Sequence, residues 1–359
     1  MGSVYGKNFK VSIFGQSHAP AIGVTIDGLP AGFEIDMEQL RAFLAQRAPG
    51  QSKLSTPRRE DDAFEILSGV ADGKTCGAPF AAIIRNTNVR RRDYANLIDT
   101  PRPGHADYPS TIKYGGHQDR GGSGHFSGRL TAPLCIAGGI FRQMLAREGI
   151  RIAAHVYAVA GIEDAPFNPL SPEIDRLTGA PLRVIDPEAG ARMAEAIERA
   201  SADGDSVGGV IECAAVGLPA GIGEHMFEGL ENRIALAMFG IPAVRGIEFG
   251  TGFAAAGMKG SEHNDAYIIK DGQVATRTNH HGGILGGITS GMPVIFRIAI
   301  KPTSSIFKTQ DTVRLSHGDE TQLTIEGRHD PCIVPRALPV VEAACAMAIF
   351  DAYLDRKKE

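Results

Sequence analysis

The sequence contains no tryptophan, only five cysteines among 359 residues, and no long uncharged apolar run. None of the cysteines forms a Cys-x-x-Cys pair, which argues against both a disulfide framework and a zinc site. A membrane span needs about 20 apolar residues. The most apolar segment, residues 338–354, carries Glu342 and Asp351 and is typical of a packing helix. Lys7 and Lys10 interrupt the N-terminal region, so no secretory signal is visible and we expect a cytoplasmic protein without membrane contact.

The charge is small overall but unevenly distributed. A net charge of −4 argues against nonspecific binding to nucleic acid through a positive field. Many arginines nevertheless lie in Gly- and Pro-rich segments of the first 130 residues. They include Arg47, Arg58, Arg59, Arg90, Arg91, Arg92, Arg102, Arg120 and Arg129, together with Lys53. Local basic loops on a near-neutral protein favour a compact, multiply charged anion as ligand.

Hydrophobic patterning predicts a mixture of strands and helices. Asp36 followed by Gln39 is typical of a helix start, and Pro49 with Gly50 of a helix stop. We expect strands at 11–14, 22–26, 64–70, 79–84, 151–159, 207–216 and 293–300. We expect helices at 36–48, 130–147, 188–202, 227–239 and near the C-terminus.

A short repeat bears on domain organisation. Gly-Leu-Pro-Ala-Gly occurs at residues 28–32 and again at 217–221, each time after a strand-like run and before a helix. This predicts two related halves that pack about a pseudo-twofold axis in one domain spanning residues 1–359. Chance recurrence of a common turn sequence is the alternative.

Three polar clusters in the first half could carry chemistry. Residues 102–108, Arg-Pro-Gly-His-Ala-Asp-Tyr, would present His105 from a rigid turn beside Arg102, which suits proton transfer next to a bound anion; a plain surface turn is the alternative. Ser17 and His18 follow a strand, but neighbours in sequence rarely face each other and no nucleophile elbow is present, which disfavours serine hydrolysis. The glycine-rich residues 120–129 run into a helix and could hold a phosphate or simply form a flexible loop.

Three further motifs lie late in the chain. Residues 279–287 form a glycine-rich loop after two adjacent histidines, His280 and His281. Adjacent side chains point apart and no further ligand completes a familiar spacing, so we do not expect a metal site. Lys-Pro-Thr-Ser-Ser at 301–305 offers a cation and several hydroxyls after a strand, and Gly-Arg-His-Asp-Pro-Cys at 327–332 places an arginine near a carboxylate.

Taken together, these motifs resemble the chorismate synthase family. The resemblance rests on Phe-Gly-Gln-Ser-His at 14–18, Gln-Arg-Ala-Pro-Gly at 46–50, Arg-Arg-Glu at 58–60, residues 102–108, Gly-Gly-Ile-Leu-Gly-Gly-Ile at 282–288, residues 301–305 and residues 327–332. Any one of them is weak, whereas all of them in the family's order are highly specific. The resemblance covers nearly the whole chain.

The resemblance implies a fold, a reaction and a set of partners. The implied fold is α+β, a β-α-β sandwich with an internal pseudo-twofold repeat, and the implied assembly is a homotetramer. The implied reaction is an anti-1,4-elimination of phosphate from 5-enolpyruvylshikimate 3-phosphate that forms chorismate with reduced FMN and without net redox change. No dinucleotide fingerprint or appended reductase domain is visible, so we expect NADPH, if it is used, to reduce the flavin through an outside source.

The resemblance also implies residue roles. His18 would protonate the departing phosphate, His105 would act on the reduced flavin, and Asp330 would assist proton removal. The implied substrate contacts are Ser17, Arg47, Lys53, Arg102, Arg129 and Arg328. The implied flavin contacts are His125, Phe126, Ser127, Gly286, Lys301, Pro302, Thr303, Ser304, Ser305 and Arg328.

The sequence departs from the family pattern at three places. Gln16 stands where the family usually has Glu, Arg47 lies between Gln46 and Ala48 in a segment that is usually richer in arginine, and residues 125–131 replace the usual Arg-Ser-Ser-Ala-Arg-Glu-Thr. Gln16 and the altered glycine-rich loop leave one alternative open, a noncatalytic anion- or flavin-binding protein with the same scaffold. An ordinary phosphatase is a second alternative. The phosphatase would need a metal or a covalent nucleophile, and neither is convincing in this sequence.

Overall fold

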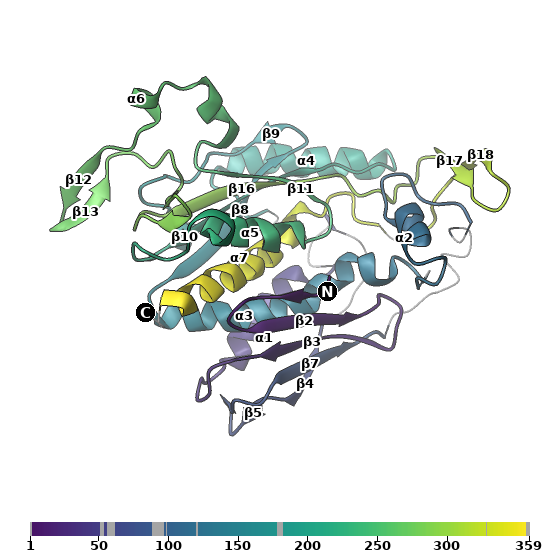
Figure 1. The fold of residues 1–359 in the computed structure, drawn as a ribbon. Coiled ribbons are helices and arrows are strands. Elements are labelled where there is room, and N and C mark those ends of the chain that lie inside the picture. The colour runs from purple at the N-terminus through teal and green to yellow at the C-terminus, as the bar shows by residue number, and fades with distance from the viewer. Residues whose placement is uncertain are drawn as a thin grey trace.

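The structure is a computed structural model that describes residues 2–50, 54–55, 62–87, 97, 99–119, 121–177, 182–327 and 329–356 (Figure 1). Two five-stranded antiparallel sheets dominate it. The first sheet has the order β1-β2-β3-β7-β4 and the second the order β11-β16-β10-β8-β9. The strands of the first sheet are β1 (Val4–Tyr5), β2 (Lys10–Gly15), β3 (Ala21–Asp27), β7 (Phe80–Arg85) and β4 (Phe64–Ser68). Those of the second are β11 (Val244–Phe249), β16 (Val294–Ile300), β10 (Gly209–Val216), β8 (Arg151–Val159) and β9 (Ile162–Glu163).

A layer of helices fills the space between the two sheets (Figure 1). Its members are α1 (Met37–Arg47), α3 (Thr131–Arg147), α5 (Leu230–Phe239) and α7 (Val334–Arg356). A further helix, α4 (Pro187–Ala202), packs against β8 and the edge strand β9. The architecture is therefore α+β, a β-α-β sandwich, as predicted.

Helix α7 is the centre of the sandwich. It is long and apolar enough by composition to cross a membrane, but 89% of its most apolar window is buried inside the protein. A helix that is apolar on all sides is stable when other elements surround it, and α7 contacts α1, α3, α5, β8 and β10. Its crossing with α3 is close, because a Cβ atom on Gly138 would lie 2.2 Å from the Cβ atom of Ala343. The segment predicted to be a packing helix is thus a core helix.

The two sheets share part of their connectivity. The order β8-β10-β16-β11 in the second sheet matches β2-β3-β7-β4 in the first, whereas the edge strand β9 follows β8 in the chain and β1 precedes β2. The two Gly-Leu-Pro-Ala-Gly turns also make the same contact, because Thr75 Oγ1 donates to the Pro30 carbonyl at 2.6 Å and Thr289 Oγ1 donates to the Pro219 carbonyl at 2.7 Å. The division into two related halves stays a prediction, with which these contacts agree, and one hydrophobic core contains residues of both sheets.

Local signals in the sequence account for many of the boundaries. The Asp36 carboxylate accepts a hydrogen bond from the Gln39 N–H at 2.9 Å and caps α1, and Gly149 with a φ of 78° follows the end of α3. The predicted elements at 11–14, 22–26, 64–70, 79–84, 130–147, 151–159, 188–202, 207–216 and 293–300 are all present within a few residues. Strand β11 and α2 (Asp107–Lys113) were not predicted. Neither were the short hairpins β5 (Val70–Ala71)–β6 (Lys74–Thr75), β12 (Tyr267–Lys270)–β13 (Gln273–Thr276), β14 (Ile284–Leu285)–β15 (Ile288–Thr289) and β17 (Gln310–Arg314)–β18 (Asp319–Leu323).

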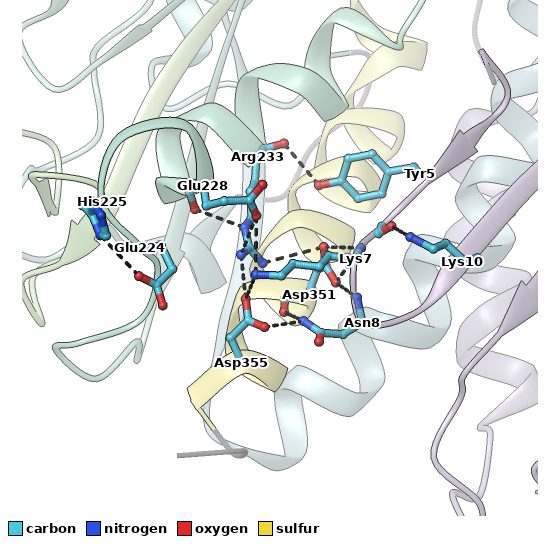
Figure 2. Close-up of polar contacts among 11 residues, drawn as sticks. Tyr5, Lys7, Asn8, Lys10, Glu224, His225, Glu228, Arg233, Asp351 and Asp355 are labelled. Carbon is cyan, nitrogen blue, oxygen red and sulfur yellow. Dashed lines mark hydrogen bonds and ion pairs between the residues drawn. The ribbon is translucent and has the colours of Figure 1, made fainter.

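The N-terminal segment is tied to the end of α7 (Figure 2). The buried Asp351 carboxylate accepts hydrogen bonds from the backbone N–H of Lys7 at 2.9 Å and of Asn8 at 2.7 Å. Arg233 of α5 pairs with Asp355 at 2.6 Å, and the Tyr5 hydroxyl donates to the Arg233 carbonyl at 3.2 Å. These bonds join β1, α5 and α7 at the end of the sandwich where α7 terminates.

A second buried charged cluster lies in the second sheet. His155 is fully buried, and its two ring nitrogens each lie 3.0 Å from a carboxylate, Asp164 on one side and Glu212 on the other. Glu212 also accepts a hydrogen bond from Arg297 at 2.8 Å. Burial alone would lower the pKa of His155, but the hydrogen bonds to the two carboxylates raise it above its ordinary value of 6.5. The imidazole is therefore held as a cation between two anions.

This cluster predicts a pH-dependent stability. Because the folded pKa of His155 is raised, its contribution is complete below pH 6.5 and is lost as the pH rises through the folded value. We expect His155→Gln to lower the free energy of unfolding by about 3 kcal/mol at pH 6, since two buried carboxylates lose their shared cation. Urea unfolding between pH 6 and 9 measures both effects. The loss in the variant should shrink as the pH rises. His225→Gln is the control, because its side chain is 81% exposed. It should change neither the free energy of unfolding nor its dependence on pH.

Candidate active site

The predicted motifs meet at one end of the sandwich. The turn that carries His18 joins β2 to β3, and β7 ends beside it, because Ala21 pairs with Arg85. Asn86, the residue after β7, donates through Nδ2 to the carbonyls of Gln16 at 3.2 Å and Ala19 at 2.8 Å. The glycine-rich segment before α3 packs on the same turn, since the Ser17 N–H donates to the Gly124 carbonyl at 3.1 Å.

His18 is enclosed by the glycine-rich segment. The side chains of Ser17 and His18 are buried, and Ser17 Oγ lies 2.9 Å from His18 Nδ1. Ser17 Oγ also donates to the Gly121 carbonyl at 3.2 Å. The Ser17 hydroxyl therefore contacts the His18 ring at Nδ1 and holds its orientation. The expectation that these neighbours do not face each other was wrong, but the contact fixes the ring of His18 rather than activating Ser17.

Gly122 determines how closely the glycine-rich segment approaches His18. A Cβ atom at position 122 would lie 2.5 Å from His18 Cε1 and 2.9 Å from Ser17 Oγ. The φ of Gly122 is 69°, a conformation that side-chain-bearing residues adopt only with strain. Glycine is therefore required here for steric and conformational reasons together.

Arg102 connects this segment to His105. Arg102 forms a two-bond pair with Asp107, at 2.7 Å from Nε and 2.8 Å from Nη2. His105 Nδ1 lies 2.6 Å from the same carboxylate. Arg102 Nη2 also donates to the Gly122 carbonyl at 3.2 Å, and Nη1 donates to Ser305 Oγ at 3.3 Å. His18, His105 and the segment 301–305 are thus gathered around one buried guanidinium group.

Asp107 was not among the predicted site residues, although it lies within the motif. Burial by itself would raise the pKa of Asp107, but hydrogen bonds from Arg102 and His105 hold it well below its ordinary value. The carboxylate therefore stays ionised and orients the His105 ring through Nδ1, which leaves Nε2 for other partners.

Two more predicted cations share one carboxylate. Arg47 and Arg129 are buried, and both pair with Asp62, whose side chain is fully buried. Arg47 Nε donates to Thr131 Oγ1 at 3.0 Å, and Arg129 Nε donates to Asn86 Oδ1 at 3.3 Å. Through Asn86 this group is connected to the turn that carries His18.

Asp330 is joined to the same group by an arginine that the motifs did not indicate. Arg336 Nη1 pairs with Asp330 Oδ2 at 2.5 Å, and Arg336 Nε donates to the Arg47 carbonyl at 3.1 Å. The neighbouring His329 has its pKa lowered by burial and further by the charge of Arg102. The segment that carries Asp330 therefore lies between the Arg47 and Arg102 clusters, and the three predicted catalytic groups belong to one connected region.

The segment 301–305 follows β16 and faces this region. Ser305 is buried and accepts the hydrogen bond from Arg102, and a Cβ atom on Gly104 would lie 3.6 Å from that of Ser304. Burial, and then the charge of Arg245, lower the pKa of Lys301. Thr303 Oγ1 is buried without a hydrogen-bond partner in the part of the chain that the structure describes. An orphaned buried hydroxyl beside a lysine and two serines fits a segment that binds a phosphate-bearing ligand such as FMN.

The other predicted cofactor contacts, His125, Phe126 and Ser127, differ in their surroundings. His125 bonds to Ser3 Oγ at 2.8 Å and the Gly15 carbonyl at 3.0 Å, and the side chain of Phe126 is 39% exposed. Ser127 Oγ accepts from the Arg129 N–H at 3.2 Å, and so caps the turn that positions Arg129. The predicted contacts Lys53 and Arg328 lie outside the described residues.

Gly286 lies away from the other predicted contacts of this chain. It is in the turn of the β14–β15 hairpin, which precedes β16, whereas residues 301–305 follow β16. The hairpin contacts the turn after β10, because Gly221 N–H donates to the Thr289 carbonyl at 2.9 Å. The seven residues of β16 separate the two segments by about 20 Å.

Neither the paired histidines nor the cysteines form a reactive centre. The backbone N–H groups of His280 and His281 both donate to Asp265, at 2.8 Å and 3.0 Å, so this carboxylate has a structural role in the loop. Among the described residues, no group of three or more His, Cys, Asp or Glu side chains could hold a metal ion. All five cysteines are free, and burial raises the pKa of the Cys332 thiol to about 12, which makes it an unreactive packing residue.

The fold and this region define a class of protein, an α+β enzyme whose histidines and paired arginines suit a multiply anionic substrate. Comparisons with known proteins identify the family. The sequence profile described as chorismate synthase matches residues 9–354. The chorismate synthase of Lancefieldella parvula is 47% identical, over 98% of this chain and 96% of that protein. The chorismate synthase of Thermococcus gammatolerans is 46% identical, over 98% of each chain.

A solved structure extends the similarity to three dimensions. A crystal structure of chorismate synthase aligns with a TM-score of 0.76 at 28% sequence identity, and covers 98% of this chain and 93% of that one. The chain belongs to the chorismate synthase family. Family membership makes it a lyase of the shikimate pathway that forms chorismate.

The approach of Gly122 to His18 predicts a specific loss of activity. We expect Gly122→Ala to lower the turnover number for chorismate formation by about 100-fold, because the added methyl group displaces the His18 ring by an ångström or more. Steady-state kinetics and a thermal melt would separate activity from folding. Gly149→Ala is the matched control, since Gly149 also has a positive φ but an added Cβ would meet nothing within 4 Å. Equal turnover in the two variants would contradict this role of Gly122.

Proposed function

We propose that the protein converts 5-enolpyruvylshikimate 3-phosphate to chorismate by an anti-1,4-elimination of phosphate that requires reduced FMN. The observation that carries the proposal is the convergence of His18, His105 and three arginines, Arg47, Arg102 and Arg129, at one end of the sandwich. This substrate has a phosphate and two carboxylates, and such a trianion needs several fixed cations in a site from which water is excluded.

The residues divide into binding and proton-transfer roles. Arg47, Arg102 and Arg129 would bind the anionic groups of the substrate together with Ser17. His18 would donate the proton on Nε2 to the departing phosphate, because its Nδ1 is engaged by Ser17. Loss of phosphate builds negative charge, so a positioned acid beside fixed cations lowers the barrier electrostatically.

The phosphate end of the cofactor would be held by the segment after β16, through Lys301, Thr303, Ser304 and Ser305. The buried Thr303 hydroxyl, which has no partner among the described residues, supports this assignment. The chemistry supplied by reduced FMN at this site would be transient donation of an electron to the substrate. His105, oriented by Asp107, would act beside the cofactor. Asp330 would assist proton removal from the substrate ring while Arg336 fixes its carboxylate.

The surface supports a homotetramer as the working assembly. Large apolar side chains are exposed on α5, on the turn at 226–228 that precedes it, and on the arm that ends in the β12–β13 hairpin, which projects from the body in Figure 1. They include Phe227, Leu236, Phe253, Tyr267, Ile269 and Val274, each more than half exposed. Exposed apolar surface of this extent is typical of an interface between proteins.

We propose a cytoplasmic location, with flavin reduced by an outside source rather than by this chain.

An anaerobic assay tests the reaction directly. We expect chorismate and phosphate to form in equal amounts when chemically reduced FMN is supplied, and neither to form with oxidised FMN or without flavin. NADPH with oxidised FMN should give no product unless a separate reductase is added. Phosphate release without flavin would instead indicate a phosphatase. Binding of substrate and reduced flavin without chorismate would indicate a noncatalytic protein.

The two histidines should affect turnover more than binding. We expect His18→Ala and His105→Ala each to lower the turnover number by about 100- to 10,000-fold, with little change in KM, because each supplies a proton transfer in the reaction. Steady-state kinetics with reduced FMN measures both constants. His225→Ala, at an exposed position, is the control. A raised KM with an unchanged turnover number would show that the substituted histidine binds substrate and does not transfer a proton.

A further inference from the structure

We propose that Asp62 is a positioning residue of the substrate site, which holds the guanidinium groups of Arg47 and Arg129 side by side; this rests on the proposed function. Neither the motifs nor the family resemblance indicated Asp62. Its carboxylate pairs through one oxygen with Arg47 and through the other with Arg129. The two arginines come from elements far apart in sequence, the end of α1 and the turn before α3.

The charges make the carboxylate necessary. The side chains of Arg47 and Arg129 are 5% and 6% exposed, and that of Asp62 is fully buried. Two buried guanidinium groups that pair with the same carboxylate repel each other, and there is no water between them to screen the repulsion. A carboxylate between them offsets this repulsion and allows both guanidinium groups to stay buried side by side. Burial by itself would raise the pKa of Asp62, but the two arginines lower it, so the group stays ionised in the working pH range.

The remaining contacts fix the direction of each guanidinium group. Arg47 donates to Thr131 Oγ1 at 3.0 Å and to the Gly128 carbonyl at 3.2 Å, and Arg129 donates to Asn86 Oδ1 at 3.3 Å. These neutral partners orient the two side chains but do not compensate their charge. Only Asp62, among the described residues, pairs with both arginines.

The test compares two buried carboxylates. We expect Asp62→Asn to raise both the KM and the calorimetric Kd of 5-enolpyruvylshikimate 3-phosphate by about tenfold, the loss of one modest charged contact, with less than about a threefold change in turnover number. Asp351→Asn is the matched control. Asp351 is also buried and also pairs with an arginine, but it lies at the end of α7 away from the site. It should lower the melting temperature and leave KM and Kd unchanged.

Asp62→Glu covers the case in which the Asn variant does not fold. It keeps the charge but shifts the carboxylate by one methylene, so KM and Kd should rise less than in Asp62→Asn. Wild-type affinity in both Asp62 variants, or an equal loss of affinity in Asp351→Asn, would overturn the role of Asp62. Wild-type protein that binds the substrate without forming chorismate would instead overturn the proposed function, because calorimetry reports the affinity without turnover.

Discussion

The structure depends on keeping positive charge in a place where water cannot stabilise it. Among the described residues, the arginines gathered at the site are therefore paired with carboxylates of the chain. Arg102 pairs with Asp107, Arg47 and Arg129 share Asp62, and Arg336 pairs with Asp330. An unpaired buried charge would cost several kcal/mol, whereas these pairs allow cations to be fixed in advance of the ligand. The proposed chemistry follows from this arrangement, because fixed cations stabilise departing phosphate without reorganisation.

The internal repeat explains why the site lies at one end of the sandwich. Helices α3 and α7 are counterparts, and so are β7 and β16, the last strand of each half. In each half, the chain between that last strand and the long helix contributes to the site. In the first half this connection carries Asn86, Arg102 and His105. In the second it carries Lys301 and Asp330. The β2–β3 turn with His18 has no second copy, because the connection from β8 to β10 contains β9 and α4 instead.

Much of the fold could be predicted from local sequence signals. Alternating apolar residues gave β2, β3, β8 and β16, and a capping Asp36 gave the start of α1, because these patterns reflect one buried face or one backbone bond. Strand β11 and α2 were missed, since Gly246 interrupts the first and Pro109 the second. The pentapeptide repeat was informative because both copies need the same turn and the same threonine contact.

The site was predictable only in part, for a physical reason. Motifs identify residues whose type is chemically constrained, such as His18, Arg102 and His105. Some partners of the other site residues lie outside the quoted motifs: Asp62 pairs with Arg47 and Arg129, Asn86 bonds to Arg129, and Arg336 pairs with Asp330. The same limit applies to Gly286, whose motif is clear although its hairpin lies at the far end of β16. Sequence order does not reveal which loops share an end of the sandwich.

The central claim is that loops of both halves form one anion-binding pocket. A crystal structure of the protein with 5-enolpyruvylshikimate 3-phosphate and FMN tests this most directly. The account predicts that His18, His105 and Asp330 border a single cavity, with the substrate phosphate within hydrogen-bond distance of His18 and its anionic groups on Arg47, Arg102 and Arg129. Substrate bound elsewhere on the chain, or catalytic side chains that face separate cavities, would contradict it.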